Sequence, residues 1–170
     1  VPVAILTSVF LSRYCPKKFY GICKSGINLM AGIPSIVYGL FGMLFFVTAL
    51  HWGMSLLSGA LTMVIMVLPL IMRTAEEALK SVPDSYREAS FGLGAGKLRT
   101  IFTIVLPSAV PGILAGVILA IGRVIGETAA LIYTAGTVAE VPKNLMGSGR
   151  TLALHMYVPV SYTHLTLPTI

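Results

Sequence analysis

The sequence has little charge, few cysteines and no cluster of metal-binding side chains. Only 11% of its 170 residues are Asp, Glu, Lys or Arg, against about 25% in typical soluble domains. In contrast, 56% are hydrophobic, and the mean hydropathy is +0.89. A soluble fold of this size has too little interior to cover so much apolar surface, and a disordered chain would need the opposite composition. The composition argues against a water-soluble enzyme and predicts an integral membrane protein.

The sequence offers little for metal, cofactor or nucleic-acid chemistry. The two cysteines, Cys15 and Cys23, lie in a Lys-rich segment, and the three histidines are far apart along the chain. We therefore expect no metal site, no cofactor, and thiols that stay reduced in the cytoplasm. The net charge of +6 comes from Lys and Arg scattered between apolar runs. A nucleic-acid partner would need a basic face with interleaved aromatics, so none is expected.

Long uncharged runs divide the chain. Residues 25–72 contain no Asp, Glu, Lys or Arg, which is enough for two spans of about 20 residues joined by a turn at 50–53. Pro34 suits the start of the first span. Residues 1–11 are too short to cross a bilayer and are expected to end an earlier span. The expected spans are 33–50, 54–72 and 100 to about 135.

The distribution of Lys and Arg orients these spans. Segments 13–24 and 73–99 carry four and five of these residues, whereas the turn at 50–54 has none and 136–158 has two. Because cytoplasmic loops are enriched in Lys and Arg, we expect the first two segments to be cytoplasmic loops and the others extracytoplasmic. The predicted fold class is all-α, a polytopic transmembrane helical bundle.

The segment 83–96 carries the most specific pattern. Pro83 and Asp84 favour the first turn of a short helix over 83–90. Three glycines then break the helix and permit a sharp turn: Gly92, Gly94 and Gly96. A short helix held between two spans suits docking in a groove of a cytoplasmic partner. These glycines lack the spacing of a nucleotide-binding loop, so the chain is not expected to bind ATP itself.

The last expected span combines small residues with two charges. At about 100° per residue, one arc of about 140° holds Gly112, Gly116, Gly122, Arg123, Gly126 and Glu127. Glycines let neighbouring helices approach closely, so this face is expected to pack in the bundle.

The two charges have two interpretations. Arg123 and Glu127, one turn apart, could form a structural ion pair that offsets the cost of about 2.5–3.5 kcal/mol for each intramembrane charge. Alternatively, they line an anion path in which the planar fork of the arginine binds oxyanions. Arg73 ends an expected span on the cytoplasmic side, where arginines commonly extend their charge to the membrane surface. It is therefore weaker evidence for such a path.

One set of spaced residues resembles a known motif. The EAA loop of ABC importer permeases is matched at every fixed position except Ser90, where that motif has Ala. The residues that match it are Glu88, Ala89, Gly94, Ile104, Leu106 and Pro107. In that family the loop forms a coupling helix seated in an ATP-binding subunit. The resemblance implies that this contact is made by Tyr86, Arg87, Glu88, Ala89 and Gly94.

Two longer stretches, 29–42 and 122–129, are similar to the permease subunits of Pst-type phosphate importers, and 41–42 and 151–157 favour the PstA branch over PstC. The resemblance covers 1–157, the expected transmembrane domain with its coupling loop at 73–100. It implies a non-catalytic half of a two-permease pore in the bacterial cell membrane, with about four of six spans in this chain. The implied phosphate path uses Arg73, Arg123 and Glu127.

The resemblance also implies partners and leaves alternatives. The partners are a dimer of ATP-binding subunits, a second, PstC-like permease, a periplasmic or extracellular phosphate-binding protein, and membrane lipid. Residues 158–170 depart from the family and are expected to be an atypical tail. The same machinery could carry another oxyanion, such as sulfate or molybdate. A secondary transporter would not need a docking loop, and a membrane scaffold would gain nothing from two intramembrane charges.

Overall fold

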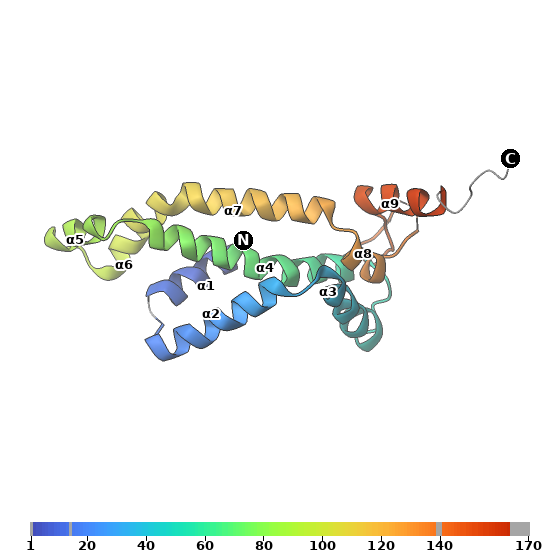
Figure 1. The fold of residues 1–170 in the computed structure, drawn as a ribbon, viewed down its shortest axis with the longest axis horizontal. Coiled ribbons are helices and arrows are strands. Elements are labelled where there is room, and N and C mark those ends of the chain that lie inside the picture. Colours follow the sequence, from blue (N-terminus) through green and yellow to red (C-terminus); the bar gives the residue numbers. More distant parts are fainter. Residues whose placement is uncertain (1, 14, 139–140, 164–170) are drawn as a thin grey trace. The chain divides into compact units, whose positions relative to one another are not determined.

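The computed structural model describes residues 2–13, 15–138 and 141–163, and most of these residues are helical (Figure 1). The predicted all-α class is confirmed. The chain divides into unit 1, Val1–Gly32 with Leu68–Ile121, and unit 2, Ile33–Val67 with Gly122–Ile170. The boundaries fall at the break after Gly32 and within two long helices, α4 (Leu56–Ser81) and α7 (Leu106–Gly126).

Unit 1 is built around the second part of α4 and most of α7. Its other elements are α1 (Pro2–Arg13), α2 (Lys17–Gly32), α5 (Asp84–Gly92), α6 (Lys97–Thr100) and the π-helical η2 (Ile101–Val105). Its core is formed by buried aliphatic side chains from α1, α4, the link between α4 and α5, η2 and α7, namely Val9, Ala75, Ala78, Leu79, Val82, Ile101, Val105, Ala109 and Ile113. This core joins the last turns of α4 to the start of the helix that follows the 83–96 segment.

Small residues set the distance between α4 and α7 in unit 1. A methyl group added at Gly112 would lie 2.7 Å from Ala78 Cβ, and one at Gly116 would lie 2.2 Å from Thr74 Oγ1. Both distances are too short for a side chain, so these glycines permit the close approach of the two helices. Methyl groups added at Gly122 and Gly126 would meet no neighbouring atom within 4 Å, so the packing role of these two glycines stays a prediction.

Unit 2 contains α3 (Ser35–Gly42), the π-helical η1 (Met43–Ala49), the first part of α4, α8 (Ala129–Thr134) and α9 (Leu152–Thr163). Gly39 lies directly on α8, because a methyl group there would be 2.8 Å from Ala130 Cα. Buried hydroxyl groups reinforce this unit: Ser55 Oγ and Ser58 Oγ lie 2.9 Å apart. The glycine allows α3 and α8 to meet closely, and the two hydroxyls are paired locally at the start of α4.

The described residues include two helices long and apolar enough to cross a membrane, Leu56–Ser81 and Lys97–Ile125. A third span results if the broken pair Lys18–Gly32 and Ser35–Ala49 is counted as one, and Pro2–Leu11 is a shorter apolar helix. The predicted turn near 50–53 is confirmed, with His51 at φ 55 and Gly53 at φ 66. The start of a helix directly after Pro34 is also confirmed.

Two sequence-based expectations are wrong. Segment 13–24 is not an open loop, because α2 begins at Lys17 and continues to Gly32; a count of basic residues predicts a side of the membrane but says nothing of backbone conformation. The last span is not one helix to residue 135, because α7 ends at Gly126 and α8 begins at Ala129. Glycine favours such an ending. In the tail assigned to 158–170, α9 reaches Thr163, and residues 164–170 lie outside the described residues.

Candidate functional site: coupling loop and charged groups

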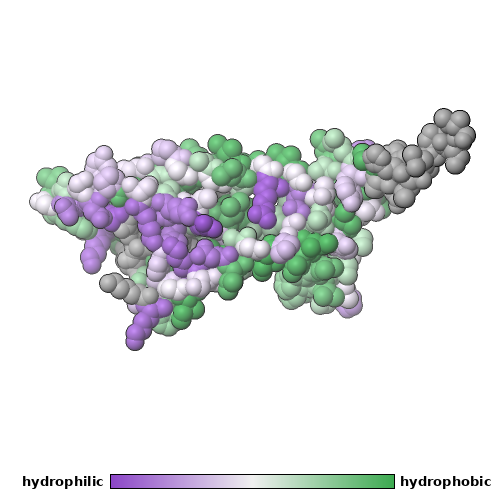
Figure 2. All heavy atoms as spheres, in the orientation of Figure 1, coloured by the Kyte–Doolittle hydropathy of each residue, from purple (hydrophilic) through white to green (hydrophobic). Residues whose placement is uncertain are grey.

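The predicted docking segment forms a helix followed by a sharp turn. The first turn of α5 holds Asp84, directly after Pro83, which confirms the predicted start of this helix. The turn follows at Gly94, whose φ of 79 lies in the left-handed region that glycine adopts readily. On the face shown in Figure 2, hydrophilic side chains gather over the part of unit 1 that holds the end of α4 and the α5–α6 segment. This segment therefore projects a polar helix from a largely apolar chain.

The side chains of α5 divide between solvent and the unit itself. Tyr86, Glu88 and Ala89 are exposed. Arg87 is mostly covered, with its side chain 18% exposed, and pairs through Nη1 with the exposed carboxylate of Asp84. Burial lowers the pKa of the Arg87 guanidinium from its ordinary value, and the arginine remains charged because that value is very high. These three residues, together with the exposed Gly94, are thus available to a partner, and Arg87 holds the first turns of α5 together.

Ser90 is the one departure from the EAA motif, and its hydroxyl has a structural role. Ser90 Oγ lies 2.8 Å from Thr100 Oγ1, and both side chains are buried. The N–H of Ala95 donates to the backbone carbonyl of Ser90 at 3.1 Å. These bonds close the turn between α5 and α6 from the inside. An alanine would keep the backbone bond and lose the hydroxyl contact.

Exposed apolar side chains extend the docking segment beyond the motif. Phe91 is 46% exposed and Leu93 89% exposed, which is unusual for large apolar groups in a polar segment. Leu93 also lines a pocket of about 280 Å³ together with Gly94 and Arg99. The sequence analysis did not include these two side chains among the docking residues. Their positions on either side of Gly92, where α5 ends, could have indicated that they are exposed.

Arg123 lies in the last turn of α7, which ends at Gly126. Its side chain is exposed, and no carboxylate of the described residues lies within ion-pair distance of it. The structural ion pair between Arg123 and Glu127, one of the two interpretations, is therefore not formed in this structure.

Glu127 has a different partner because α7 ends before it. Its side chain is buried, and Oε1 accepts a hydrogen bond from the N–H of Ala130 at 3.2 Å. A carboxylate at this position accepts a hydrogen bond from an N–H in the first turn of α8 that has no partner within the helix. It is also stabilised by the positive end of the helix dipole. The expected angle of about 100° per residue placed Glu127 one turn from Arg123 because it assumes an unbroken helix.

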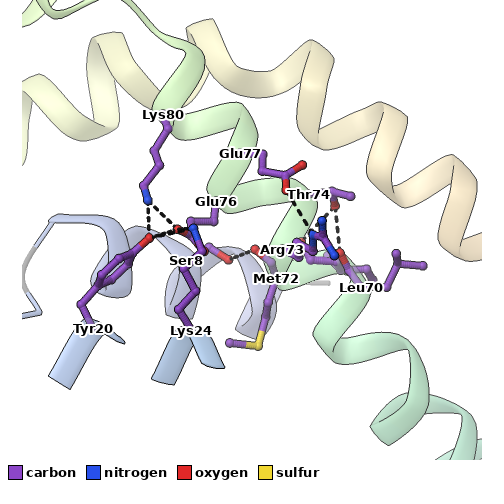
Figure 3. Close-up of polar contacts among 11 residues, drawn as sticks. Ser8, Tyr20, Lys24, Leu70, Met72, Arg73, Thr74, Glu76, Glu77 and Lys80 are labelled. Atoms are coloured by element: carbon purple, nitrogen blue, oxygen red, sulfur yellow. Dashed lines mark hydrogen bonds and ion pairs between the residues drawn. The ribbon is translucent and has the colours of Figure 1, made fainter. Parts of the chain in front are cut away.

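Arg73 lies in the α4 part of unit 1 and has a carboxylate partner. Its Nε donates to Glu77 Oε1 at 3.1 Å, and both side chains are more than half exposed (Figure 3). Such an exposed pair contributes little to stability. Of the three residues implied in the phosphate path, Arg73 belongs to unit 1, whereas Arg123 and Glu127 belong to unit 2.

A further group of charged residues was not found by sequence reasoning. Glu76 in α4 has a side chain that is 5% exposed, with Lys80 Nζ at 2.7 Å and Lys24 Nζ at 3.5 Å from its Oε1. The hydroxyl of Tyr20 donates to the same oxygen and accepts from Lys80 (Figure 3). We call Tyr20, Lys24, Glu76 and Lys80 the α2–α4 polar cluster. The two spacings of four residues were visible in the sequence, but the pairing of α2 with α4 was not.

Comparisons with known proteins agree with the fold. A family model described as binding-protein-dependent transport system inner membrane component matches residues 2–163. A probable ABC transporter permease protein YqgI from Bacillus subtilis is 37% identical over 171 residues, covering 92% of this chain and 58% of the relative. The phosphate transport system permease protein PstA 1 of Mycobacterium tuberculosis is 36% identical over 168 residues, covering 99% of this chain and 54% of the relative. PstA of Mycobacterium leprae is 37% identical with the same coverage.

The apolar helices and the matching family define a multi-pass membrane protein of the helical-bundle type. The chain belongs to the family of binding-protein-dependent transport system inner membrane components. The resemblance to PstA permeases is confirmed at about 36% identity over nearly the whole chain. The chain spans about half the length of the curated relatives it matches.

Proposed function

We propose that this protein is the permease subunit of an ATP-driven importer for inorganic phosphate. The observation that carries this proposal is Arg123, an exposed arginine in an apolar helix without a carboxylate partner among the described residues. Arg123 lies in the last turn of α7, where none of the described carboxylates neutralises it, and its guanidinium can donate two parallel hydrogen bonds to a phosphate-like oxyanion. The relatives named phosphate transport system permeases support the choice of phosphate.

The phosphate path uses Arg123, Glu127 and Arg73. Arg123 attracts and orients the anion. Glu127 limits how tightly an anion is held, because its carboxylate repels it, and it also fixes the start of α8. Arg73 is paired with Glu77, so phosphate would compete with that carboxylate there. Selectivity then comes from charge and hydrogen bonding, without a covalent step.

Energy comes from separate ATP-binding subunits that dock on the coupling loop. Tyr86, Glu88 and Ala89 present an exposed face of α5, and Gly94 sets the turn behind it. Hydrolysis moves α5, and its rigid attachment to the unit 1 core transmits the movement to α4 and α7, which gives alternating access. The chain is not an enzyme itself. A second, PstC-like permease completes the pore, and a phosphate-binding protein delivers the anion from outside.

The proposal is tested with the full-length protein, assembled with its partners in lipid vesicles. Arg123→Gln is expected to abolish phosphate uptake while the complex still assembles, and Arg123→Lys should retain part of it, because lysine keeps the charge without the fork. Arg150→Gln serves as the matched control, since this arginine binds the carbonyl of Thr137 outside the span helices. Normal uptake by Arg123→Gln would remove Arg123 from the mechanism. Sulfate or molybdate uptake in place of phosphate would assign the path to another oxyanion.

A further inference from the structure

The α2–α4 polar cluster is where α2 is attached to the rest of unit 1. The described members of the unit 1 core come from α1, α4, the link after α4, η2 and α7, and α2 contributes none of them. In contrast, Tyr20 and Lys24 of α2 both reach the buried carboxylate of Glu76, 56 residues from Tyr20 along the chain. The position of α2 against α4 therefore depends on polar bonds rather than on apolar packing.

The cluster lies in the part of α4 that leads into the coupling loop. Lys80 is four residues before Asp84, the first residue of α5. Leu79 and Val82, on either side of Lys80, are buried in the same core as Ile101 and Val105. The last turns of α4 are thus fixed on one side to the base of the coupling loop and on the other side to α2.

The chemistry of the cluster favours a bond that stays closed. Lys80 Nζ donates to the hydroxyl of Tyr20, which donates to Glu76, so the three groups form a chain in which each bond polarises the next. Lys80 Nζ also lies 4.5 Å from the centre of the Tyr20 ring, a cation–π distance. Separating α2 from α4 would remove Tyr20 and Lys24 from the buried carboxylate of Glu76 and leave it with Lys80 alone. The loss of these donors to a buried charge is unfavourable.

We propose that Tyr20 and Glu76 are positioning residues for energy coupling. They tie α2 to the end of α4, so that α2 moves with the coupling loop as one body throughout the transport cycle. The proposal rests on the proposed function, because it needs an ATP-binding subunit that moves α5.

The first test removes the cross-helix hydroxyl alone. In the full-length transporter in vesicles, Tyr20→Phe is expected to leave recovery of the complex unchanged and to lower the phosphate imported per ATP hydrolysed several-fold. Lys24→Met should have a smaller effect in the same direction, because Lys24 is the more distant cation. Lys18→Met, an exposed lysine of the same helix, is the matched control. An unchanged import-to-hydrolysis ratio in Tyr20→Phe overturns the proposal.

The second test replaces the polar tie with a covalent one. Tyr20→Cys and Lys80→Cys are combined in a full-length transporter in which every other cysteine, Cys15 and Cys23 among them, is changed to Ser. This variant is expected to be poorly coupled, and a short bifunctional thiol reagent that joins the two positions should restore coupling. A merely structural role would not give this rescue. If the cross-linked transporter stays uncoupled, or is blocked, α2 and α4 must move against one another and the proposal fails.

The two failures are distinguishable. If the unmodified complex does not import phosphate, the proposed function fails. The attachment of α2 to α4 is then tested separately, by the rate of cross-linking between positions 20 and 80. A fixed tie gives the same rate with and without ATP bound to the partner subunit. A rate that changes with nucleotide overturns the tie, whatever the transported anion is.

Discussion

The carboxylate of Glu127 accepts a hydrogen bond from the N–H of Ala130, 3.2 Å away, in the first turn of α8. This contact gives a residue implied in anion passage a second, structural task. It also separates Glu127 from Arg123, because the carboxylate is turned toward α8 rather than toward the guanidinium. The two roles can be separated by substitution.

Glu127→Gln keeps an oxygen that accepts the bond from Ala130 and removes the charge. We expect normal amounts of protein and phosphate uptake changed by about tenfold or more, the ratio that corresponds to about 1.4 kcal/mol. Glu127→Ala loses the cap as well, which costs about 0.5–2 kcal/mol of stability. Uptake assays and thermal unfolding in detergent measure the two effects. If both variants lose stability equally and Glu127→Gln transports normally, the carboxylate has only the capping role.

Gly116 and Gly122 provide a matched pair of glycine substitutions in α7. A methyl group at Gly116 would lie 2.7 Å from Thr74 Cβ, whereas one at Gly122 meets no atom within 4 Å. We expect Gly116→Ala to lower the free energy of unfolding by about 1–3 kcal/mol, as overpacking does, and Gly122→Ala to leave the isolated subunit unchanged. Thermal unfolding of each variant in detergent provides the measurement. Equal stability of the two variants would contradict the close approach of α4 and α7.

Gly39 is the corresponding position in unit 2. A methyl group there would lie 2.8 Å from Ala130 Cα and 3.2 Å from the Ala130 carbonyl oxygen. Since backbone atoms cannot move aside as a flexible side chain does, we expect Gly39→Ala to displace α8. Phosphate uptake should fall together with thermal stability. Gly32→Ala is the control, because a methyl group there would meet no atom within 4 Å, and a Gly39→Ala variant as stable as that control would show that α3 and α8 are not in contact.

Glu88 is exposed on α5 and available to the ATP-binding subunit. We expect Glu88→Lys to weaken recovery of that subunit in detergent pull-downs, because the charge facing the partner is reversed. Glu88→Gln should weaken it less. Unchanged recovery with the reversed charge would count against the docking role of α5.

Ser90 is expected to tolerate the residue that the EAA motif has at its position. Ser90→Ala removes the contact with Thr100, whose hydroxyl keeps its bond to the Gly96 carbonyl at 3.2 Å. Stability should fall by only about 1 kcal/mol, with docking retained. Loss of pull-down recovery in Ser90→Ala would mean that the hydroxyl itself sets the shape of the docking turn.

Local patterns predicted much of the fold. The start of α5 after Pro83 and the turn at Gly94 follow from the chemistry of proline and glycine, and the uncharged runs predicted apolar helices. The end of α7 at Gly126 was not predictable from periodicity, because the apolar pattern continues past it and a glycine favours an ending without requiring one. The tie between Tyr20 and Glu76 depends on how helices distant in sequence pack together, which no local pattern encodes.

The central claim is that ATP hydrolysis by a docked subunit drives phosphate through this permease. It is tested by the accumulation of radiolabelled phosphate in vesicles that contain the assembled full-length transporter and its binding protein, with ion gradients dissipated by ionophores. The account predicts accumulation that requires ATP and is lost in Arg123→Gln. Accumulation without ATP that collapses with the ion gradient would contradict it.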